Sequence, residues 1–183
     1  AGSRKQEIKD NLPDMLKAAS AFPDYQLVLA GAPGITPEYY EKYVGQANVK
    51  IIFGQTYRIL QHADAALVTS GTATLETALF RVPQVVCYKT PVKKLVRFVF
   101  THFFHIKYIS LVNLIADKTV VQELFADSFS CQAIREELNK IIRVEAYRNT
   151  MLEGYDEVIN RLGSPGASHR AARYMFESLS TPK

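Results

Sequence analysis

The hydroxyl-rich segment at residues 69–76, with the sequence TSGTATLE, is the strongest candidate for chemistry. It follows an apolar run and begins a helical pattern, so it lies where open α/β sheets bind ligands, at the carboxyl end of a parallel strand. The helix N-terminus offers free N–H groups and a partial positive charge, Gly71 lets a phosphate approach the backbone, and Ser70 and Thr72 add hydroxyls. Glu76 follows about one turn later, where its carboxylate could bind both hydroxyls of a ribose. A capped helix without a ligand would use the same residues, and spacing alone leaves both interpretations open.

Two further polar residues are weaker candidates. Arg4 would stand at another strand-to-helix turn if a strand precedes it, and its guanidinium could bind a phosphate through two parallel hydrogen bonds. On spacing alone, a solvated helix start is the favoured interpretation of Arg4. Asn113 interrupts the apolar, strand-like run SLVNL at residues 110–114, where it would either cap a turn or point into a cleft.

The positive charge of the chain is concentrated in one aromatic segment. The net charge is +4, yet residues 77 to 116 hold six Lys or Arg and no Asp or Glu, which leaves 16 basic and 18 acidic residues elsewhere. Within this segment, residues 92–105 place apolar side chains on one helical face and basic ones on the other.

This pattern fits a helix lying at a membrane surface, and equally a surface helix whose apolar stripe faces the core. Nucleic acid is a less favoured partner, because the segment is too apolar and the chain contains no recognised nucleic-acid-binding module. The side chains expected to contact a membrane are Lys93, Lys94, Arg97, Phe98, Phe100 and Phe104.

Other kinds of site find little support in the sequence. The four His residues show no metal-ligand spacing with carboxylates, and no GxSxG or Cys–His arrangement indicates a nucleophile. Cys87 lies in an apolar run and is expected in the core. We therefore predict no metal and no cofactor, and no residue of this chain is assigned as a catalytic acid or base. Without about 18 uninterrupted apolar residues, no membrane-spanning helix is predicted.

Short apolar runs alternate with helical patterns over the first two thirds of the chain. The runs are mostly unalternated and bounded by Gly, Pro, Asn or Asp, which is typical of strands buried on both faces of a parallel sheet. The alternation predicts βαβ units, and hence a Rossmann-like α/β sheet flanked by helices. A first helix is expected to place Leu12, Met15, Leu16 and Ala19 on one face, with Pro13 in its first turn. The expected strands are 25–30, 49–53, 65–69 and 84–88, and the further expected helices are 37–44, 57–62 and 72–80.

Beyond Thr119 the pattern is wholly helical, with a strong break at the GSPG sequence of residues 163–166. The predicted helices cover about 130–142, 145–162 and 166–179. We therefore expect one domain at residues 1–162 and a helical extension at 163–183. Because the chain starts in structured-looking sequence without an initiator Met, a preceding N-terminal part is expected to be missing.

Three motifs together resemble the lipid-A-disaccharide synthase family. They are GSRxxE at residues 2–7, SGTATLE at 70–76 and YISLVNL at 108–114, with the basic, aromatic segment between the last two. The SGTATLE motif alone is moderately specific, and the three in this order are much more so. The resemblance covers essentially the whole chain, as the C-terminal half of a glycosyltransferase of the two-domain GT-B fold.

The resemblance implies an inverting, metal-independent enzyme with UDP-2,3-diacylglucosamine as donor and 2,3-diacylglucosamine 1-phosphate as acceptor. Arg4 would hold the donor diphosphate with Glu7 supporting it, and Ser70, Gly71 and Thr72 would line the same pocket. Glu76 would bind the ribose. Asn113 would contact the donor or orient the leaving group. The general base is expected in the missing N-terminal half. The enzyme would act in the cytoplasm, peripherally on the inner face of the inner membrane, and a homodimer remains open.

Two alternatives compete with this interpretation. A UDP-GlcNAc 2-epimerase or a peptidoglycan-precursor glycosyltransferase would share the fold and a similar ribose-binding Glu, although a soluble epimerase has no need of the basic, aromatic segment. A non-catalytic membrane-docking or dimerisation module on a degenerate Rossmann core is the second alternative. The intact segment from Ser70 to Glu76 argues against it.

Overall fold

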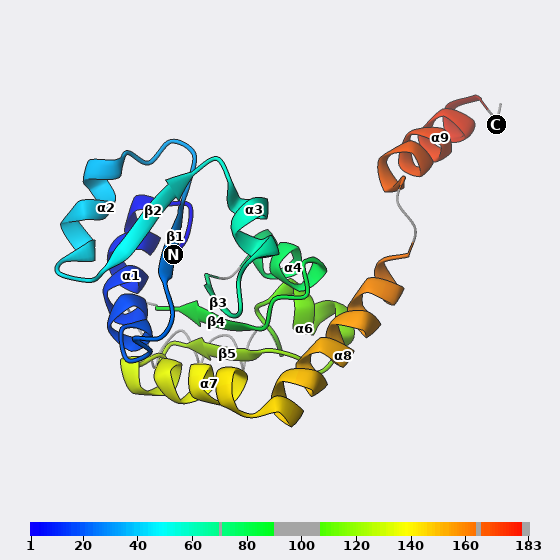
Figure 1. Ribbon diagram of the computed structural model, residues 1–183. Helices are drawn as coiled ribbons and strands as arrows, with labels where there is room; N and C mark the ends of the chain where they lie inside the picture. Colours follow the sequence, from blue (N-terminus) through cyan, green and yellow to red (C-terminus); the bar gives the residue numbers. More distant parts are fainter. Residues whose placement is uncertain (70, 90–106, 164–165, 181–183) are drawn as a thin grey trace.

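The computed structural model describes residues 1–69, 71–89, 107–163 and 166–180 (Figure 1). Every strand pair in these residues is parallel. β1 (Leu27–Gly31) pairs with β2 (Val49–Phe53), while β4 (Gln84–Tyr88) lies between β3 (Ala66–Val68) and β5 (Gln122–Phe125). The predicted α/β class with parallel strands flanked by helices is therefore confirmed.

The helices follow the predicted pattern closely. The first predicted helix buries Leu12, Met15 and Leu16 as expected, and the predicted bounds of α2 and α8 agree with the structure. The described helices are α1 (Lys5–Ala19), α2 (Pro37–Val44), α3 (Thr56–Gln61), α4 (Thr72–Leu79), α6 (Leu111–Ala116), α7 (Cys131–Arg143), α8 (Glu145–Leu162) and α9 (Ala167–Ser180).

Helices cover both faces of β4, and its side chains show which helices lie on which face. The Gln84 side chain donates to the Thr74 carbonyl on α4 at 2.9 Å and to the Tyr155 hydroxyl on α8 at 3.3 Å. Lys89, five positions along and therefore on the opposite face, forms a 2.7 Å ion pair with Asp14 of α1. Its backbone N–H donates to the Asn11 side chain, also at 2.7 Å. The β3-β4-β5 sheet is thus sandwiched between α1 and α7 on one side and α4, α6 and α8 on the other.

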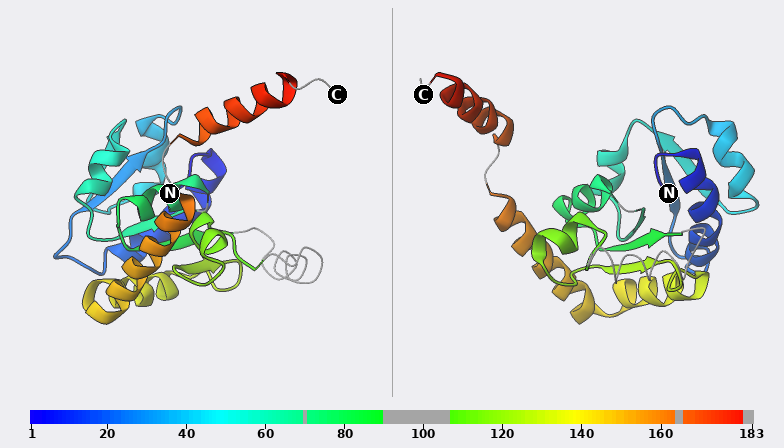
Figure 2. Two further views of the ribbon diagram at one scale, coloured as in Figure 1. Left: turned by 90° about the vertical axis from the view of Figure 1, so that its right-hand side faces the viewer. Right: turned by 180° about the vertical axis from the view of Figure 1, so that it is seen from behind.

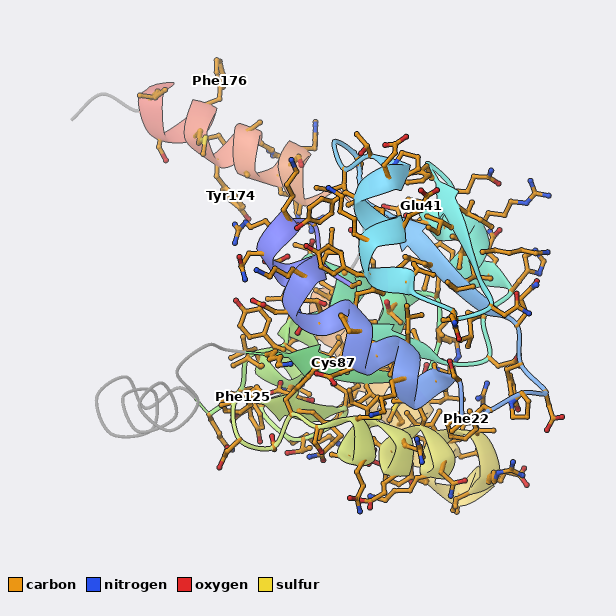
Figure 3. The ribbon with its side chains drawn as sticks, turned by 90° about the vertical axis from the view of Figure 1, so that its left-hand side faces the viewer. Phe22, Glu41, Cys87, Phe125, Tyr174 and Phe176 are labelled. Atoms are coloured by element: carbon orange, nitrogen blue, oxygen red, sulfur yellow. The ribbon has the colours of Figure 1, made fainter. Side chains whose placement is uncertain are left out.

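The buried apolar residues form two clusters rather than one. The larger cluster surrounds β4 and includes Val85, Val86 and Cys87, and Figure 3 shows Cys87 beneath α1. The smaller cluster lies between α1, α2 and the β1-β2 sheet. Ala1 is the one described hydrophobic residue that packs against both clusters. The two parts of the core therefore meet where the described chain begins.

The expectation of a wholly helical chain beyond Thr119 is wrong. Residues 122–125 form β5, which pairs with β4 from Val85 to Tyr88. The run that contains it has the sequence VVQELF, in which two polar residues hide the apolar signal of a strand. The full burial of β4 requires a neighbour on this side, and that requirement comes from tertiary structure rather than local pattern.

Three smaller expectations also need correction. Pro13 lies inside α1 rather than in its first turn, because the helix begins at Lys5; Pro13 is exposed there. The SLVNL run is not a strand: Ser110 caps the N-terminus of α6, where its hydroxyl accepts from the Asn113 N–H at 3.3 Å. Burial on both faces holds for β4 but not for β1 or β2, which keep partly exposed apolar side chains.

α9 extends away from the rest of the structure, as both views of Figure 2 show. Its large apolar side chains are exposed, and Figure 3 shows Phe176 projecting into open space. These side chains are Tyr174, Met175, Phe176 and Leu179, with exposed fractions of 67 to 87%.

In a protein consisting of these 183 residues alone, the amino group of Ala1 makes stability depend on pH. Burial lowers its pKa from 8.0 to about 6 in the folded chain. The unfolded chain therefore holds this proton more tightly between pH 6 and 8, so stability should rise with pH across that range. We expect a gain of about 1 to 2 kcal/mol in the free energy of unfolding of the 183-residue chain, measured by urea titration. N-terminal acetylation should remove this component, and an unchanged pH dependence after acetylation would contradict the assignment.

Candidate functional site

The N-terminus of α4 is open and carries no negative charge. Gly71 occupies the cap position with φ of 126°, a backbone conformation that favours glycine. No side chain caps the helix, and its first turn contains no acidic residue. Nothing lies within 4 Å of where a Cβ on Gly71 would stand, so a ligand can approach the backbone here. Free N–H groups at such an end attract anions.

The hydroxyls near this helix end fall into two kinds. Thr74 and Thr77 are buried and donate to backbone carbonyls within the turn, Thr74 to Gly71 at 2.8 Å and Thr77 to Ala73 at 2.7 Å. Their hydroxyls are therefore used by the helix itself. Thr72 is exposed and available to a ligand. Ser70 lies outside the described residues.

Two polar groups beside the helix end lack partners among the described residues. Thr69, directly after β3, is only 4% exposed, yet its hydroxyl has no hydrogen-bond partner. Glu76 is half-buried one turn into α4, and no hydrogen bond or ion pair involves its carboxylate. A buried hydroxyl without a partner is unfavourable, which gives Thr69, the first residue of the predicted segment 69–76, an individual role that the sequence analysis did not assign to it.

The N-termini of α1 and α6 differ from that of α4, because a carboxylate of the protein already occupies each. At α1, Glu7 Oε2 accepts from the backbone N–H of Ser3 at 3.0 Å and of Arg4 at 3.3 Å. The other oxygen of Glu7 lies 3.5 Å from the Arg4 guanidinium, so Glu7 supports Arg4 as expected. The Arg4 side chain is 81% exposed and can reach a ligand.

At α6 the capping carboxylate belongs to Glu123 on β5. It accepts from the backbone N–H groups of Ile109 at 3.0 Å and Ser110 at 2.9 Å, and from the Ser110 hydroxyl at 2.7 Å. Sequence reasoning missed Glu123 because β5 itself was missed. The carboxylate of Glu123 inside the mostly apolar run VVQELF was the available signal, since a charged group needs partners when the run is packed.

Asn113 is the hub of the same hydrogen-bond network. Its amide nitrogen donates to the Val121 carbonyl and to Glu123, both at 2.9 Å. Its amide oxygen accepts from the N–H groups of Val120 at 2.8 Å and Val121 at 3.0 Å. These four bonds use the full capacity of the amide, and Asn113 is 1% exposed. The structure therefore places it as a brace between α6 and β5, and contact with a donor stays a prediction.

The strand register brings the α4 and α6 ends to one edge of the sheet. Val68 pairs with Val86, and Val86 pairs with Glu123, so these three residues lie at the same level. Thr69 follows Val68 directly, and α4 packs against α6. The two helix ends are thus neighbours, and the open one is the anion-binding candidate.

Several predicted features stay untested. The six residues expected to contact a membrane (Lys93, Lys94, Arg97, Phe98, Phe100 and Phe104) lie outside the described residues. In the part of the chain that is described, no helix is both long enough and apolar enough to cross a bilayer. Nor do three or more His, Cys, Asp or Glu residues of that part gather in a group suited to a metal ion.

Comparison with known proteins decides the family. The family model described as "Lipid-A-disaccharide synthetase" matches residues 1–171. The chain belongs to the lipid-A-disaccharide synthase family. It is 36% identical to the lipid-A-disaccharide synthase of Myxococcus xanthus, over 97% of this chain and 48% of the relative. It is 34% identical to that of Prochlorococcus marinus, over 98% of this chain and 48% of the relative.

The chain spans about half the length of the synthases that it matches. A solved structure supports the fold: the calicheamicin glycosyltransferase CalG4 superimposes with a TM-score of 0.59 at 18% identity, over 98% of this chain and 43% of that one. The match to the synthase family favours this interpretation of the motifs over an epimerase, a peptidoglycan glycosyltransferase or a docking module.

The brace around Asn113 can be tested by stability. Asn113→Ala should lower the free energy of unfolding by about 3 kcal/mol, because it strands Val120, Val121 and Glu123 without partners in the interior. Asn139, exposed on α7, provides the matched control, and Asn139→Ala should change stability by less than about 0.5 kcal/mol. Both values come from urea unfolding followed by circular dichroism. A loss below 1 kcal/mol for Asn113→Ala would contradict the network.

Proposed function

We propose that this chain is the donor-binding part of a lipid-A-disaccharide synthase. The full-length enzyme would transfer 2,3-diacylglucosamine from UDP to 2,3-diacylglucosamine 1-phosphate, giving the β-1,6-linked disaccharide and UDP. The observation that carries this proposal is the open N-terminus of α4, whose first turn has no acidic residue, whereas carboxylates already occupy the N-termini of α1 and of the neighbouring α6. Among these three helix ends, only that of α4 leaves its N–H groups open to a diphosphate.

The residues then take distinct roles in the transfer. UDP leaves with negative charge, which the α4 N-terminus with Ser70, Gly71 and Thr72, together with the Arg4 guanidinium, would stabilise without a metal. The free carboxylate of Glu76 would accept the ribose hydroxyls. Attack by the acceptor hydroxyl on the face opposite the departing UDP inverts the anomeric carbon. Asn113 would contact the donor or orient the leaving group from its place between α6 and β5.

The remainder of the full-length protein would complete the enzyme. Residues 1–162 would form the donor domain, and residues 163–183 the helix that crosses to the other half or to a second subunit. The exposed apolar residues of α9 support this crossing, because an isolated apolar helix face is unfavourable in water. The acceptor site and general base would come from the N-terminal half, so this chain alone should bind donor weakly and form no disaccharide.

Acylated substrates would bring the enzyme to a membrane. The basic and aromatic side chains of residues 92–105 would hold it peripherally on the cytoplasmic face of the inner membrane, where cations attract anionic headgroups. Both proposed substrates carry acyl chains, which gives this segment a reason to contact lipid.

The donor pocket can be tested by titrating the chain with UDP in a calorimeter. UDP should bind saturably and more tightly than ADP. Arg4→Ala and Glu76→Ala should each weaken binding by about 10- to 100-fold, because each removes a charge-assisted contact.

Arg135 on α7 and Glu153 on α8 are exposed charged residues far along the chain from the site, and they provide matched controls. Arg135→Ala and Glu153→Ala should bind UDP as the parent does. Equal binding of UDP and ADP, or equal losses in all four variants, would count against the pocket.

A substitution at Thr69 should affect UDP binding and protein stability differently. If its buried hydroxyl awaits a ligand, Thr69→Val should leave the free energy of unfolding unchanged or raise it by up to about 1 kcal/mol, since it removes an unpaired polar group. The same change should weaken UDP binding several-fold, and Thr69→Ser should restore it. Loss of stability in Thr69→Val, or undiminished UDP affinity, would assign the hydroxyl a different partner.

A further inference from the structure

One face of α1 carries a row of polar residues at intervals of about one turn. Glu7, Asn11 and Asp14 follow one another at spacings of four and three, so their side chains share a face. Glu7 caps the N-terminus of the helix, and Asp14 is partly exposed. Asn11 differs from both, because it is 0% exposed in a helix whose other buried residues are apolar. A buried amide of this kind needs partners for its donors and its acceptor.

The side chain of Asn11 joins the first turn of α1 to the end of β4. Its amide nitrogen donates to the Glu7 carbonyl at 2.8 Å, and its amide oxygen accepts from the backbone N–H of Lys89 at 2.7 Å. Lys89 directly follows β4, and its ammonium group also lies 2.7 Å from the Asp14 carboxylate. That ion pair is partly exposed and contributes little, so the buried Asn11 bond is the stronger of the two contacts.

This bond fixes α1 along its own axis. The apolar packing of α1 on β4 has no preferred direction, so it resists separation of the two elements more than it resists sliding. A hydrogen bond, in contrast, weakens steeply when its geometry changes. An amide supplies a donor for the Glu7 carbonyl and an acceptor for the Lys89 N–H at once. Asn11 therefore gives α1 and the end of β4 a defined register.

β4 also holds α4, the helix with the open N-terminus. The Gln84 side chain donates to the Thr74 carbonyl in the first turn of α4 at 2.9 Å. The strand register brings Gly71 and Lys89 to one edge of the sheet, because each follows three residues after a paired position of β3 or β4. One buried strand is thus the common support of the two helices that carry the proposed phosphate-binding groups.

Arg4 depends on this support more than on its own packing. Its side chain is 81% exposed, so little packing holds it in place. The Glu7 carboxylate lies 3.5 Å from its guanidinium and accepts from its backbone N–H at 3.3 Å. The carbonyl of the same Glu7 is the one that accepts from Asn11. A shift of α1 along β4 would therefore move Arg4 relative to the open N-terminus of α4.

We propose that Asn11 is a positioning residue of the donor site: it fixes α1 to the end of β4 and thereby sets the place of Arg4 relative to α4. Asn11 itself does not touch the donor, because it is fully buried and both ends of its amide are bonded within the protein. The proposal rests on the proposed function for the role of Arg4, whereas the link between α1 and β4 rests on the described contacts alone.

A double-mutant cycle with Arg4 tests the proposal through UDP affinity. Asn11→Leu keeps the approximate size of the side chain and suits a helix, but it breaks the link to Lys89. It should weaken UDP binding to the 183-residue chain about five- to tenfold, as measured by amide NMR shifts during titration. In the Arg4→Ala background the same change should weaken binding less than about twofold, because the group that it positions is gone. A general loss of stability would act in both backgrounds.

A second variant and a matched control keep the test independent of folding. Asn11→Ser is too short to span to Lys89 and leaves room for water, and it should lose UDP affinity as Asn11→Leu does. Ser20, at the other end of α1, donates to the Leu16 carbonyl at 2.8 Å. Ser20→Ala removes a side-chain bond of α1 without touching the link, and it should keep UDP affinity within about twofold of the parent.

The spectrum of the free chain gives a readout that needs no ligand. In Asn11→Leu the amide NMR signals of Ser3 and Arg4 should shift, because both N–H groups donate to Glu7, whose turn has lost its link to β4. The signal of Thr72 at the N-terminus of α4 should stay, since α4 is held to β4 by Gln84 instead.

Equal losses of UDP affinity in both backgrounds, unchanged affinity in both Asn11 variants, or unmoved signals of Ser3 and Arg4 would each overturn the proposal. A chain that binds UDP no better than ADP, or whose affinity ignores Arg4→Ala, would reject the proposed function and the positioning role that rests on it. Shifted signals of Ser3 and Arg4 would then still show the link between α1 and β4, so the two failures are distinguishable.

Discussion

Burial of β4 on both faces and both edges is the constraint on which the rest of the structure depends. A strand in this position must be largely apolar and must receive helices on each side. Residues 84–87 are accordingly buried, and the polar side chain of Gln84 bonds to α4 and α8. Its parallel neighbours fix the level of everything that follows them, because Val86 pairs with Val68 on one side and Glu123 on the other. That single register places the loop after β3 and the start of α6 at one edge. The position of the candidate site is therefore set by the packing of the sheet, and the polar contacts form between segments that this packing has already brought together.

Electrostatics then distinguishes otherwise similar helix ends at that edge. Each helix N-terminus presents N–H groups and attracts negative charge. Glu7 and Glu123 satisfy two of these ends from within the protein, and such a carboxylate competes with any ligand anion for the same donors. The end of α4 has a glycine in place of a capping side chain, and its own hydroxyls at Thr74 and Thr77 turn into the helix. An anion is therefore expected to bind at the N-terminus of α4, because that helix end has no carboxylate of the protein bound to its N–H groups.

The sequence predicted the elements whose signal is local and missed those whose cause is distant. β2, β4, α2 and α8 have strong periodic or apolar patterns with clear stops, and their bounds agree with the structure. β5 is short and half polar, and it forms because β4 needs a neighbour. Pro13 misled the assignment of the first helix, since an exposed proline can sit inside a helix held by tertiary packing. For the site, the glycine and hydroxyl pattern located the α4 end, but neither Glu123 nor the unpaired hydroxyl of Thr69 has a motif, because both depend on packing between segments far apart in the sequence.

Asn113 shows how a motif and a geometry can point to different roles for one residue. The family resemblance suggests donor contact, yet the amide has four protein partners and no remaining donor or acceptor. Direct contact would require at least one of these bonds to break, leaving a buried N–H or carbonyl unpaired. A change at Asn113 that impaired transfer while the protein stayed folded would therefore act first through the position of α6 and Glu123. Because α6 packs against α4, displacement of α6 would also disturb α4 and, with it, the open helix end.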